Sequence, residues 1–233
     1  MKRVLRDNGL SIALFALFLA SLLGQSLTGW REHNDEQRDH NRAAVSYGQY
    51  LTSGDFLEAT FENWESEFMQ MAAFLVLSAV LIQRGAAESK KPPEEEEEER
   101  KQKDEEEAPE GESSQNGHPP ADAPWPVHRG GLVLVLYKRS LSLVLSALFL
   151  VSFVAHGLGG QAKYNDEAIA HGQPTMGLIE YMTSARFWFE SFQNWQSEFL
   201  SVGVLVVLSI FLRQSGSPES KPVEAPHSQT GTE

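Results

Sequence analysis

The sequence predicts an all-α integral membrane protein with four transmembrane helices, arranged as two parallel tandem copies of a helix pair that a disordered acidic linker joins. Three observations predict this fold class. The 233-residue chain holds four strongly apolar segments, it repeats itself at one fixed offset, and a glutamate-rich stretch lies between the two copies. The mean hydropathy of -0.31 averages over these very different segments and describes none of them.

The duplication keeps one offset along its whole length. Gly9 to Lys90 aligns without a gap to Ser140 to Lys221, and about two in five of the aligned residues are identical. The best-preserved stretch is the octapeptide FENWESEF, which recurs as FQNWQSEF. We therefore expect a first two-helix membrane repeat at 1–90, a disordered acidic cytoplasmic linker at 91–131, a second two-helix membrane repeat at 132–221 and a disordered tail at 222–233.

Each copy begins with an apolar segment, Leu10 to Leu27 and Leu141 to Leu158. At about 1.5 Å per residue, helices of this length approach the roughly 30 Å thickness of the hydrocarbon layer. The first segment, with its basic start, also fits a cleaved signal peptide. The aligned segment inside the chain has to work as a span, and this favours a transmembrane helix at both positions.

The second apolar segment of each copy, Phe68 to Ile82 and Phe199 to Leu212, is only about 15 residues long, which is short of a full crossing. The octapeptide upstream supplies the missing length. Hydroxyl side chains at Thr52-Ser53 and Thr183-Ser184 are typical N-caps, and these helices are therefore expected to begin near residues 54 and 185.

The tryptophan of each octapeptide then lies at the far membrane interface, where an apolar ring with a hydrated N–H is favoured. The spacing i, i+3 and i+7 puts two phenylalanines on the same helix face as the tryptophan. The predicted membrane anchors are Phe61, Trp64 and Phe68 in the first copy and Phe192, Trp195 and Phe199 in the second.

The distribution of Lys and Arg predicts the orientation. About 11 of these side chains flank the spans on the side of the termini, against about five on the other side, so both termini and the linker should be cytoplasmic. Both copies then enter the membrane in the same direction. The linker has few large apolar side chains to bury, which predicts disorder. Leu132 to Leu136 is expected at the cytoplasmic interface, with a strand as the alternative.

Two glutamates are candidates for an ion or proton site. Glu67 and Glu198 follow their tryptophans by three residues, roughly 4 to 5 Å inside the hydrocarbon, and Asn63 and Asn194 lie one turn upstream of them. One hypothesis is a paired proton or cation site near the outer membrane face. The alternative is that both carboxylates reach up to the lipid headgroups.

Histidines offer weaker candidates. The expected outer loops carry Asn34-Asp35-Glu36 with His40 and Asn165-Asp166-Glu167 with His171, and these could ligate a divalent metal only if the two copies converge. A solvated loop without a metal is favoured. His156, which aligns with Gln25, is expected to bond a backbone carbonyl or to reach water.

Several function classes receive no support. The chain has no cysteine, so it has no disulfide and no thiolate nucleophile or metal ligand. No nucleophile elbow, phosphate-binding glycine loop or zinc-hydrolase helix is recognisable. We predict no catalytic residue, no cofactor and no enzyme activity. The expected partners are the lipid bilayer and either a second copy or other membrane proteins, and no nucleic acid.

Four motifs of the first copy are RDNGLS from Arg6, GQSLTGW from Gly24, YLTSGDF from Tyr50 and FENWESEFMQMAAF from Phe61. With these motifs the chain resembles an uncharacterised bacterial family of membrane proteins, domain of unknown function 6766. The resemblance covers both copies, although the second has Gln161 in place of Trp30 and Arg186 in place of Asp55. It implies a bacterial membrane location and supplies no mechanism and no catalytic residue.

The sequence therefore predicts a multi-pass protein of the bacterial plasma (inner) membrane that is a non-enzymatic scaffold or accessory subunit. The alternative is a small transporter or channel that uses Glu67 and Glu198. The two hypotheses differ in whether these carboxylates face each other across the bundle or face the headgroups.

Overall fold

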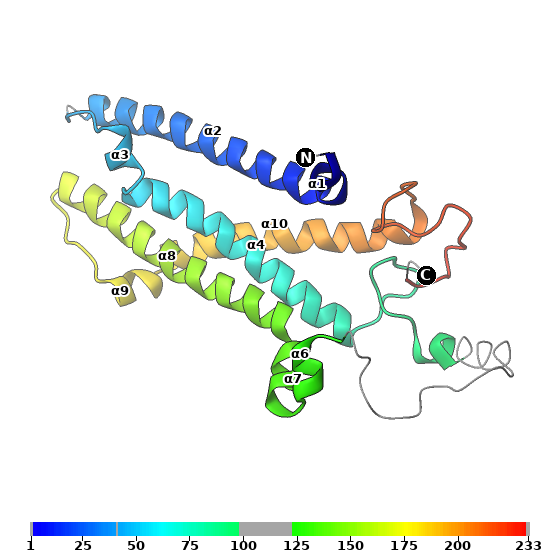
Figure 1. Ribbon diagram of the computed structural model, residues 1–233. Helices are drawn as coiled ribbons and strands as arrows, with labels where there is room; N and C mark the ends of the chain where they lie inside the picture. The colour runs from blue at the N-terminus through cyan, green and yellow to red at the C-terminus, as the bar shows by residue number, and fades with distance from the viewer. Residues whose placement is uncertain (1, 41, 98–122, 232–233) are drawn as a thin grey trace, which may run out of the picture. The chain divides into compact units, whose positions relative to one another are not determined.

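The computed structural model describes residues 2–40, 42–97 and 123–231, and the elements it defines within these ranges are all α-helices (Figure 1). The predicted all-α class is confirmed. Most of the predicted linker, residues 98–122, lies outside the described residues. The long helices are α2 (Gly9–Asp39), α4 (Gly54–Val80), α8 (Ser140–Ala170) and α10 (Ala185–Phe211), and the short ones are α1 (Lys2–Asp7), α3 (Tyr47–Tyr50), α6 (Trp125–Arg129), α7 (Gly131–Lys138) and α9 (Leu178–Met182).

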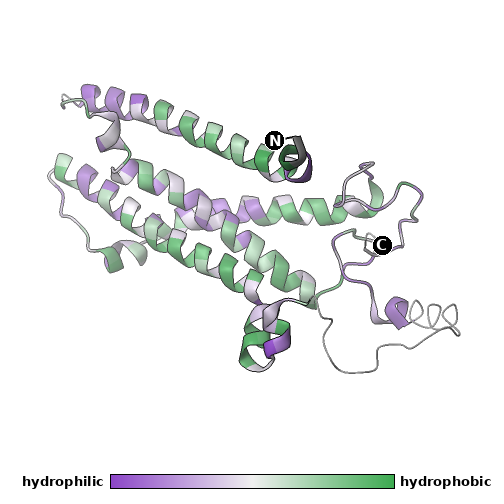
Figure 2. Cartoon of the chain, viewed as in Figure 1, coloured by the Kyte–Doolittle hydropathy of each residue, from purple (hydrophilic) through white to green (hydrophobic). Residues whose placement is uncertain are grey.

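Three of the long helices, α2, α8 and α10, are long and apolar enough to cross a membrane. In Figure 2 the apolar stretch of α2 gives way to hydrophilic residues towards the C-terminal end of the helix. The 27-residue α4 matches α10 in length, but it contains Glu65, Glu67 and Gln70 and ends before Leu81 and Ile82, which lowers its mean hydropathy. The predicted fourth span therefore stays a prediction.

The second helix of each copy begins where the hydroxyl residues predicted. Helix α4 starts at Gly54 and α10 at Ala185, each directly after a serine. The Phe56 N–H donates to the Ser53 hydroxyl, and the Phe187 N–H donates to the Ser184 hydroxyl, both at 3.4 Å. These bonds satisfy a helix-terminal N–H that has no partner inside the helix.

The predicted outer loops after the first spans are wrong, because α2 and α8 continue to Asp39 and Ala170. Both Asn-Asp-Glu motifs consequently lie on helices. The residues after each apolar segment include good helix formers such as Glu, Gln and Arg, and an i, i+3 ion pair joins Asp35 to Arg38 at 2.6 Å. Residues 132–136 belong to helix α7, so the strand alternative is wrong, and the placement at the cytoplasmic interface stays a prediction.

An asparagine clamps the chain that follows each first helix. The Asn34 side chain accepts from the Val45 N–H at 2.7 Å and donates to the Val45 carbonyl at 3.1 Å. The aligned Asn165 makes the same two bonds to Met176, at 2.8 and 3.1 Å. Each clamp fixes the direction in which the chain returns towards the second helix.

Gln161 takes over a bond that Trp30 makes in the first copy. The Trp30 indole N–H donates to the Val45 carbonyl at 2.9 Å, and the Gln161 amide donates to the Met176 carbonyl at the same distance. The two side chains differ in size and share a donor at the required place. This departure from the first copy therefore preserves the local structure.

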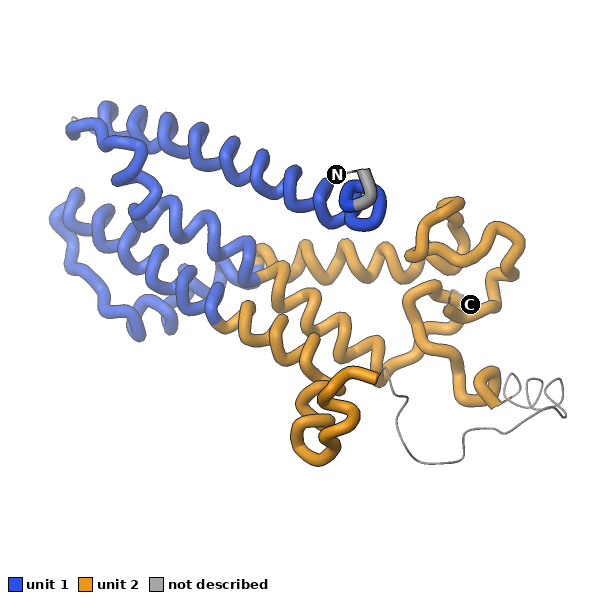
Figure 3. The backbone as a smooth tube through the Cα atoms, in the orientation of Figure 1, with its two compact units in different colours: residues 1–65, 151–192 blue, residues 66–150, 193–233 orange. Residues whose placement is uncertain are grey.

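The structure forms two compact units: unit 1 comprises residues 1–65 and 151–192, and unit 2 comprises residues 66–150 and 193–233 (Figure 3). In unit 1, α4 and α8 approach each other at glycines. A Cβ added at Gly159 would collide with the backbone of Leu57 and Glu58, and one added at Gly54 would collide with the Lys163 backbone.

In unit 2, Lys221 holds the C-terminal segment. Its buried ammonium group donates to the carbonyl oxygens of Gly85 (2.5 Å), Gln229 (3.0 Å), His227 (3.1 Å) and Pro226 (3.4 Å). Burial lowers the pKa of Lys221, and the nearby positive charge of Arg213 lowers it further. The end of the first copy and the end of the chain are thus joined by one side chain.

Candidate functional site

A buried acid–base pair lies in the interior of unit 1. His156, on α8, and Glu65, on α4, are 0 % and 1 % exposed, and His156 Nδ1 lies 2.7 Å from Glu65 Oε2. The imidazole ring stacks on Phe187 with ring centroids 4.8 Å apart. A histidine and a carboxylate sealed from water and packed against an aromatic ring cost free energy unless they are paired, as they are here.

Glu190, on α10, approaches the other ring nitrogen of the same histidine. Its Oε2 atom lies 3.6 Å from His156 Nε2, and it accepts a hydrogen bond from the Tyr181 hydroxyl at 2.9 Å. Arg186 pairs with Glu190 at 3.1 Å and with Glu167 at 3.0 Å. Charged contacts thus run from Glu167 on the surface of unit 1 to the buried histidine.

A second carboxylate of unit 1 is buried next to a lysine. Lys163 Nζ lies 2.6 Å from Glu58 Oε2 and 3.9 Å from Asp55, which in turn pairs with His33 at 2.7 Å. The other carboxylate oxygen of Glu58 has no hydrogen-bond partner among the described residues, although Glu58 is only 4 % exposed. Buried polar atoms are rarely left without a partner in folded proteins.

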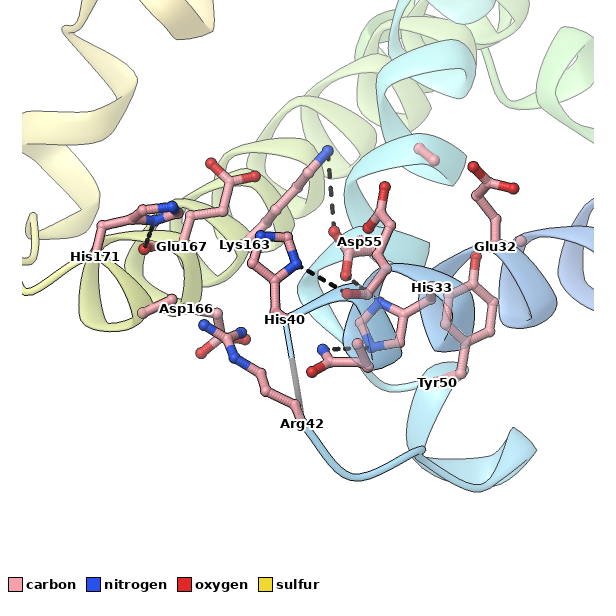
Figure 4. Close-up of a pocket in the computed structure, with 15 residues that line it drawn as sticks. Glu32, His33, His40, Arg42, Tyr50, Asp55, Lys163, Asp166, Glu167 and His171 are labelled. Carbon is pink, nitrogen blue, oxygen red and sulfur yellow. Dashed lines mark hydrogen bonds and ion pairs between the residues drawn. The ribbon is translucent and has the colours of Figure 1, made fainter.

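An open cleft of about 570 Å³ leads to these residues within unit 1. The ends of α2 and α8 and the first turns of α4 form its walls, and Asp55, Lys163 and Glu167 belong to its lining. Figure 4 shows Lys163 reaching across from α8 to Asp55, and His33 contacting Asp55 from α2. The cleft and the buried pair are therefore connected through side chains that carry charge.

Tyr50 and Tyr181, at aligned positions of the two copies, are buried in this region and pack against the first helix of their own copy. The glycines opposite them, Gly29 and Gly160, leave room for each hydroxyl, because an added Cβ would collide with it. Burial raises the pKa of Tyr181 far above its usual range, and the negative charge of Glu190 raises it further. Tyr181 therefore stays protonated and remains a hydrogen-bond donor to Glu190.

The predicted ion-site residues lie elsewhere. Glu67 and Asn63 are exposed, Glu198 and Asn194 are half-buried, and the Asn63 amide donates to the Ala59 carbonyl at 2.8 Å. Glu67 and Glu198, both in unit 2, are close enough for their charges to interact. The sequence-based hypothesis of a paired carboxylate site at these residues stays a prediction.

The predicted anchor tryptophans make a packing contact that recurs in both copies. Trp64 packs on Phe18 with ring centroids 5.9 Å apart, and Trp195 packs on the aligned Phe149 at 6.4 Å. Phe61 also contacts Trp64, at 5.2 Å. Phe192 and Phe199 are exposed, while Phe68 is half-buried. The octapeptide thus joins the two helices within each copy, and its placement at the membrane interface stays a prediction.

The two histidines of the Asn-Asp-Glu motifs do converge. The rings of His40 and His171 have centroids 6.3 Å apart, and both residues line the cleft. Their Nδ1 atoms lie 2.9 and 2.8 Å from the carbonyl oxygens of Glu36 and Glu167 on their own helices. Among the described residues, no group of three or more potential ligands is arranged to hold a metal ion.

A sequence signal for the buried network exists in the differences between the copies. His156, Glu65 and Glu190 align with Gln25, Gln196 and Ala59, and Glu58, Lys163 and Arg186 align with Phe189, Glu32 and Asp55. Every member therefore differs in charge or polarity from its counterpart. From the sequence, Arg186 is noted only as a departure from Asp55, and His156 is expected to bond a backbone carbonyl or water. The other four residues carry no prediction.

A comparison with known families gives a match over almost the whole chain. The family model described as "Domain of unknown function (DUF6766)" matches residues 1–232. No curated protein and no solved structure matches the chain.

Proposed function

Because the chain belongs to the DUF6766 family, whose description assigns no activity, we propose a function from its own geometry: it is a multi-pass membrane protein that transfers protons through the pair of His156 and Glu65. The observation that carries this proposal is the complete burial of both side chains between long apolar helices. Ionisable groups inside membrane-spanning helices are costly and are typically found on ion or proton pathways.

The geometry at His156 suits a proton relay. An imidazole can accept a proton at one ring nitrogen and release one from the other, and it exchanges protons near neutral pH when its surroundings permit. Here Nδ1 faces Glu65 at 2.7 Å and Nε2 faces Glu190 at 3.6 Å, so each nitrogen has its own carboxylate. For a proton to pass between His156 and Glu190, the longer of these two distances has to shorten or a water molecule has to bridge it.

The cleft supplies the access route to this relay. Glu167 lines the cleft, and Arg186 joins it to Glu190 through two charge-assisted bonds. Arginine stays protonated, so its role is to position the two carboxylates and not to pass the proton itself. With both termini on the cytoplasmic side of a bacterial plasma membrane, as the charge pattern predicts, the cleft opens to the outside.

A non-enzymatic scaffold or accessory subunit, alone or in a homo-oligomer, was the first expectation from the sequence. No contact in the described residues favours a particular partner protein. We retain this role as the outcome that follows if no proton transfer is measured.

The test uses purified protein in liposomes that contain a pH-sensitive dye, with a potassium diffusion potential to drive protons inward. We expect proton influx above that of protein-free liposomes. The variants His156→Gln and Glu65→Gln, which carry the residues of the other copy at Gln25 and Gln196, should lower this influx at least tenfold. Neither glutamine can take up a proton in the physiological pH range.

The control is the double variant Glu67→Gln with Glu198→Gln, which removes the carboxylates of the competing hypothesis and should transport protons as the native chain does. Loss of influx in this control alone would move the site to those residues. Influx equal to that of protein-free liposomes would exclude proton transfer and favour the scaffold.

A further inference from the structure

The two copies differ beside their buried tyrosines. In the second copy the Tyr181 hydroxyl donates to the Glu190 carboxylate at 2.9 Å. The aligned residues in the first copy are Tyr50 and Ala59, and both line the cleft. Ala59 provides only a methyl group where the second copy has a long carboxylate side chain. The cleft thus opens where the first copy lacks a counterpart of the Glu190 side chain.

The hydroxyl of Tyr50 lies at the wall of this cleft. Tyr50 is 5 % exposed, and its hydroxyl makes no hydrogen bond within the described ranges of the chain. The close approach to Gly29 holds the hydroxyl in place. The Tyr50 side chain is thus nine-tenths buried, while its unpaired hydroxyl borders the cleft and can accept a hydrogen bond from a ligand that enters.

The charge of the cleft selects the kind of ligand. Two of its carboxylates have basic partners inside the protein, Asp55 at His33 and Lys163, and Glu167 at Arg186. The remaining carboxylates of the lining are Glu32, Glu36 and Asp166, and in the part of the chain that the structure describes they form no ion pair. Arg42 is the one lining cation without an ion pair in those same residues. The uncompensated charge is therefore negative, and it attracts cations.

We propose that this cleft binds a small organic cation of the primary amine or guanidinium class, with one nitrogen against the Tyr50 hydroxyl in the place that Ala59 leaves open. An ammonium group donates to the hydroxyl oxygen and pairs with the carboxylate of Glu32 or Glu36. An anion of the same size would meet three uncompensated carboxylates. The volume of about 570 Å³ lies within the range of small-molecule sites.

Calorimetric titration of the detergent-solubilised full chain tests the proposal, with 1,4-diaminobutane as the probe and succinate as a probe of similar length and opposite charge. We expect the diamine to bind and succinate not to bind. Tyr50→Phe should weaken diamine binding about tenfold, because it removes the hydrogen-bond acceptor. Ala59→Gln should weaken it at least as much, since the neutral glutamine fills the place that the long Glu190 side chain takes in the second copy.

Tyr181→Phe is the matched control, because it makes the same change where Glu190 already holds the hydroxyl, and diamine binding should be unchanged. Thermal unfolding verifies that each variant folds. If Ala59→Gln does not fold, the test rests on Tyr50→Phe and Glu32→Gln, both of which should weaken diamine binding. Equal binding of succinate, no binding of the diamine at millimolar concentration, or native affinity in Tyr50→Phe would overturn the cation site.

This inference goes beyond proton transfer and does not depend on it. Diamine binding is measured without a membrane potential, and proton influx is measured without diamine. Binding without influx would remove the proposed function and keep the cation site. Influx without binding would keep the proposed function and remove the cation site.

Discussion

Glu65 and Glu67 lie two residues apart on α4, and their positions decide which of them is buried beside His156. The sequence favoured Glu67 because of its depth below the tryptophan, yet Glu65 is the buried partner of His156 and Glu67 is exposed. Two residues apart on a helix means about 200° around its axis, so the two side chains face nearly opposite directions. The packing of α4 against α8 decides which of these two faces is buried, and the sequence of α4 alone does not predict that packing.

Where the two copies differ in residue type, the replacement often preserves a contact at the same place. Gln161 replaces Trp30 and still donates to a backbone carbonyl. Where the first copy pairs His33 with Asp55, the second places Arg186 over the ring of Tyr164, at 5.8 Å from its centroid. Both arrangements link the end of the first helix to the start of the second, through an ion pair in one copy and a cation–π contact in the other.

Tyr181 predicts how stability changes in alkaline solution. Its pKa in the folded chain is raised above the ordinary tyrosine value of 10.0, so the folded protein keeps this proton where the unfolded chain has lost it. The stabilisation is complete below pH 10 and decreases as the pH rises above it, by up to about 1.4 kcal/mol per pH unit. Chemical unfolding in detergent between pH 9 and 11.5 measures this slope.

Tyr181→Phe should flatten that slope, while Tyr137→Phe, at an exposed position, should leave it unchanged. Part of the slope will persist in Tyr181→Phe, because burial and Asp55 also raise the pKa of Tyr50. A native-like slope in Tyr181→Phe would show that this hydroxyl is not sealed from water.

At the scale of helices, the sequence predicted the elements well and their contacts poorly. The starts of α4 and α10 are confirmed because a hydroxyl cap is a local signal. The ends of α2 and α8 were placed too early, since the hydrophobic pattern reports membrane thickness and says nothing of helix that continues into water. The glycine contact between α4 and α8 was missed for another reason. Gly54 is the only glycine of α4, and the glycines of α8 form no helical repeat that would indicate a contact face.

Gly159→Ala tests this helix contact. The added methyl group would collide with the backbone of Leu57 and Glu58, which cannot move aside as a flexible side chain could. Overpacking of this kind costs about 1 to 3 kcal/mol, and we expect a corresponding decrease in the free energy of unfolding.

Gly203→Ala is the control, because no atom lies within 4 Å of a Cβ added at that position of α10. The same substitution should there stabilise the helix by up to about 1 kcal/mol. If both variants change stability equally, α4 and α8 are not in backbone contact at Gly159.

At the scale of the whole molecule, orientation follows from the charge pattern and can be measured directly. The chain contains no cysteine, so a single introduced cysteine is the only thiol of this chain that a reagent can label. In intact cells, an impermeant maleimide should label Ala44→Cys and Gln173→Cys, which follow α2 and α8. It should label Glu224→Cys only after the membrane is permeabilised, since the C-terminal segment is predicted to be cytoplasmic.

Labelling of Glu224→Cys in intact cells would contradict the predicted orientation and would turn the cleft towards the cytoplasm. Equal labelling of Ala44→Cys and Glu224→Cys under both conditions would contradict a membrane barrier between these positions. Either result would require the access route to the buried histidine to be reassigned.

The four carbonyl oxygens around Lys221 also bear on how the protein is handled in the laboratory. Three of them belong to Pro226, His227 and Gln229, within the last residues of the chain. A deletion that stops before residue 226 would leave a buried ammonium group with most of its acceptors removed, and a bulky fusion at that end would crowd the same turn. Affinity tags and fluorescent reporters therefore belong at the amino terminus.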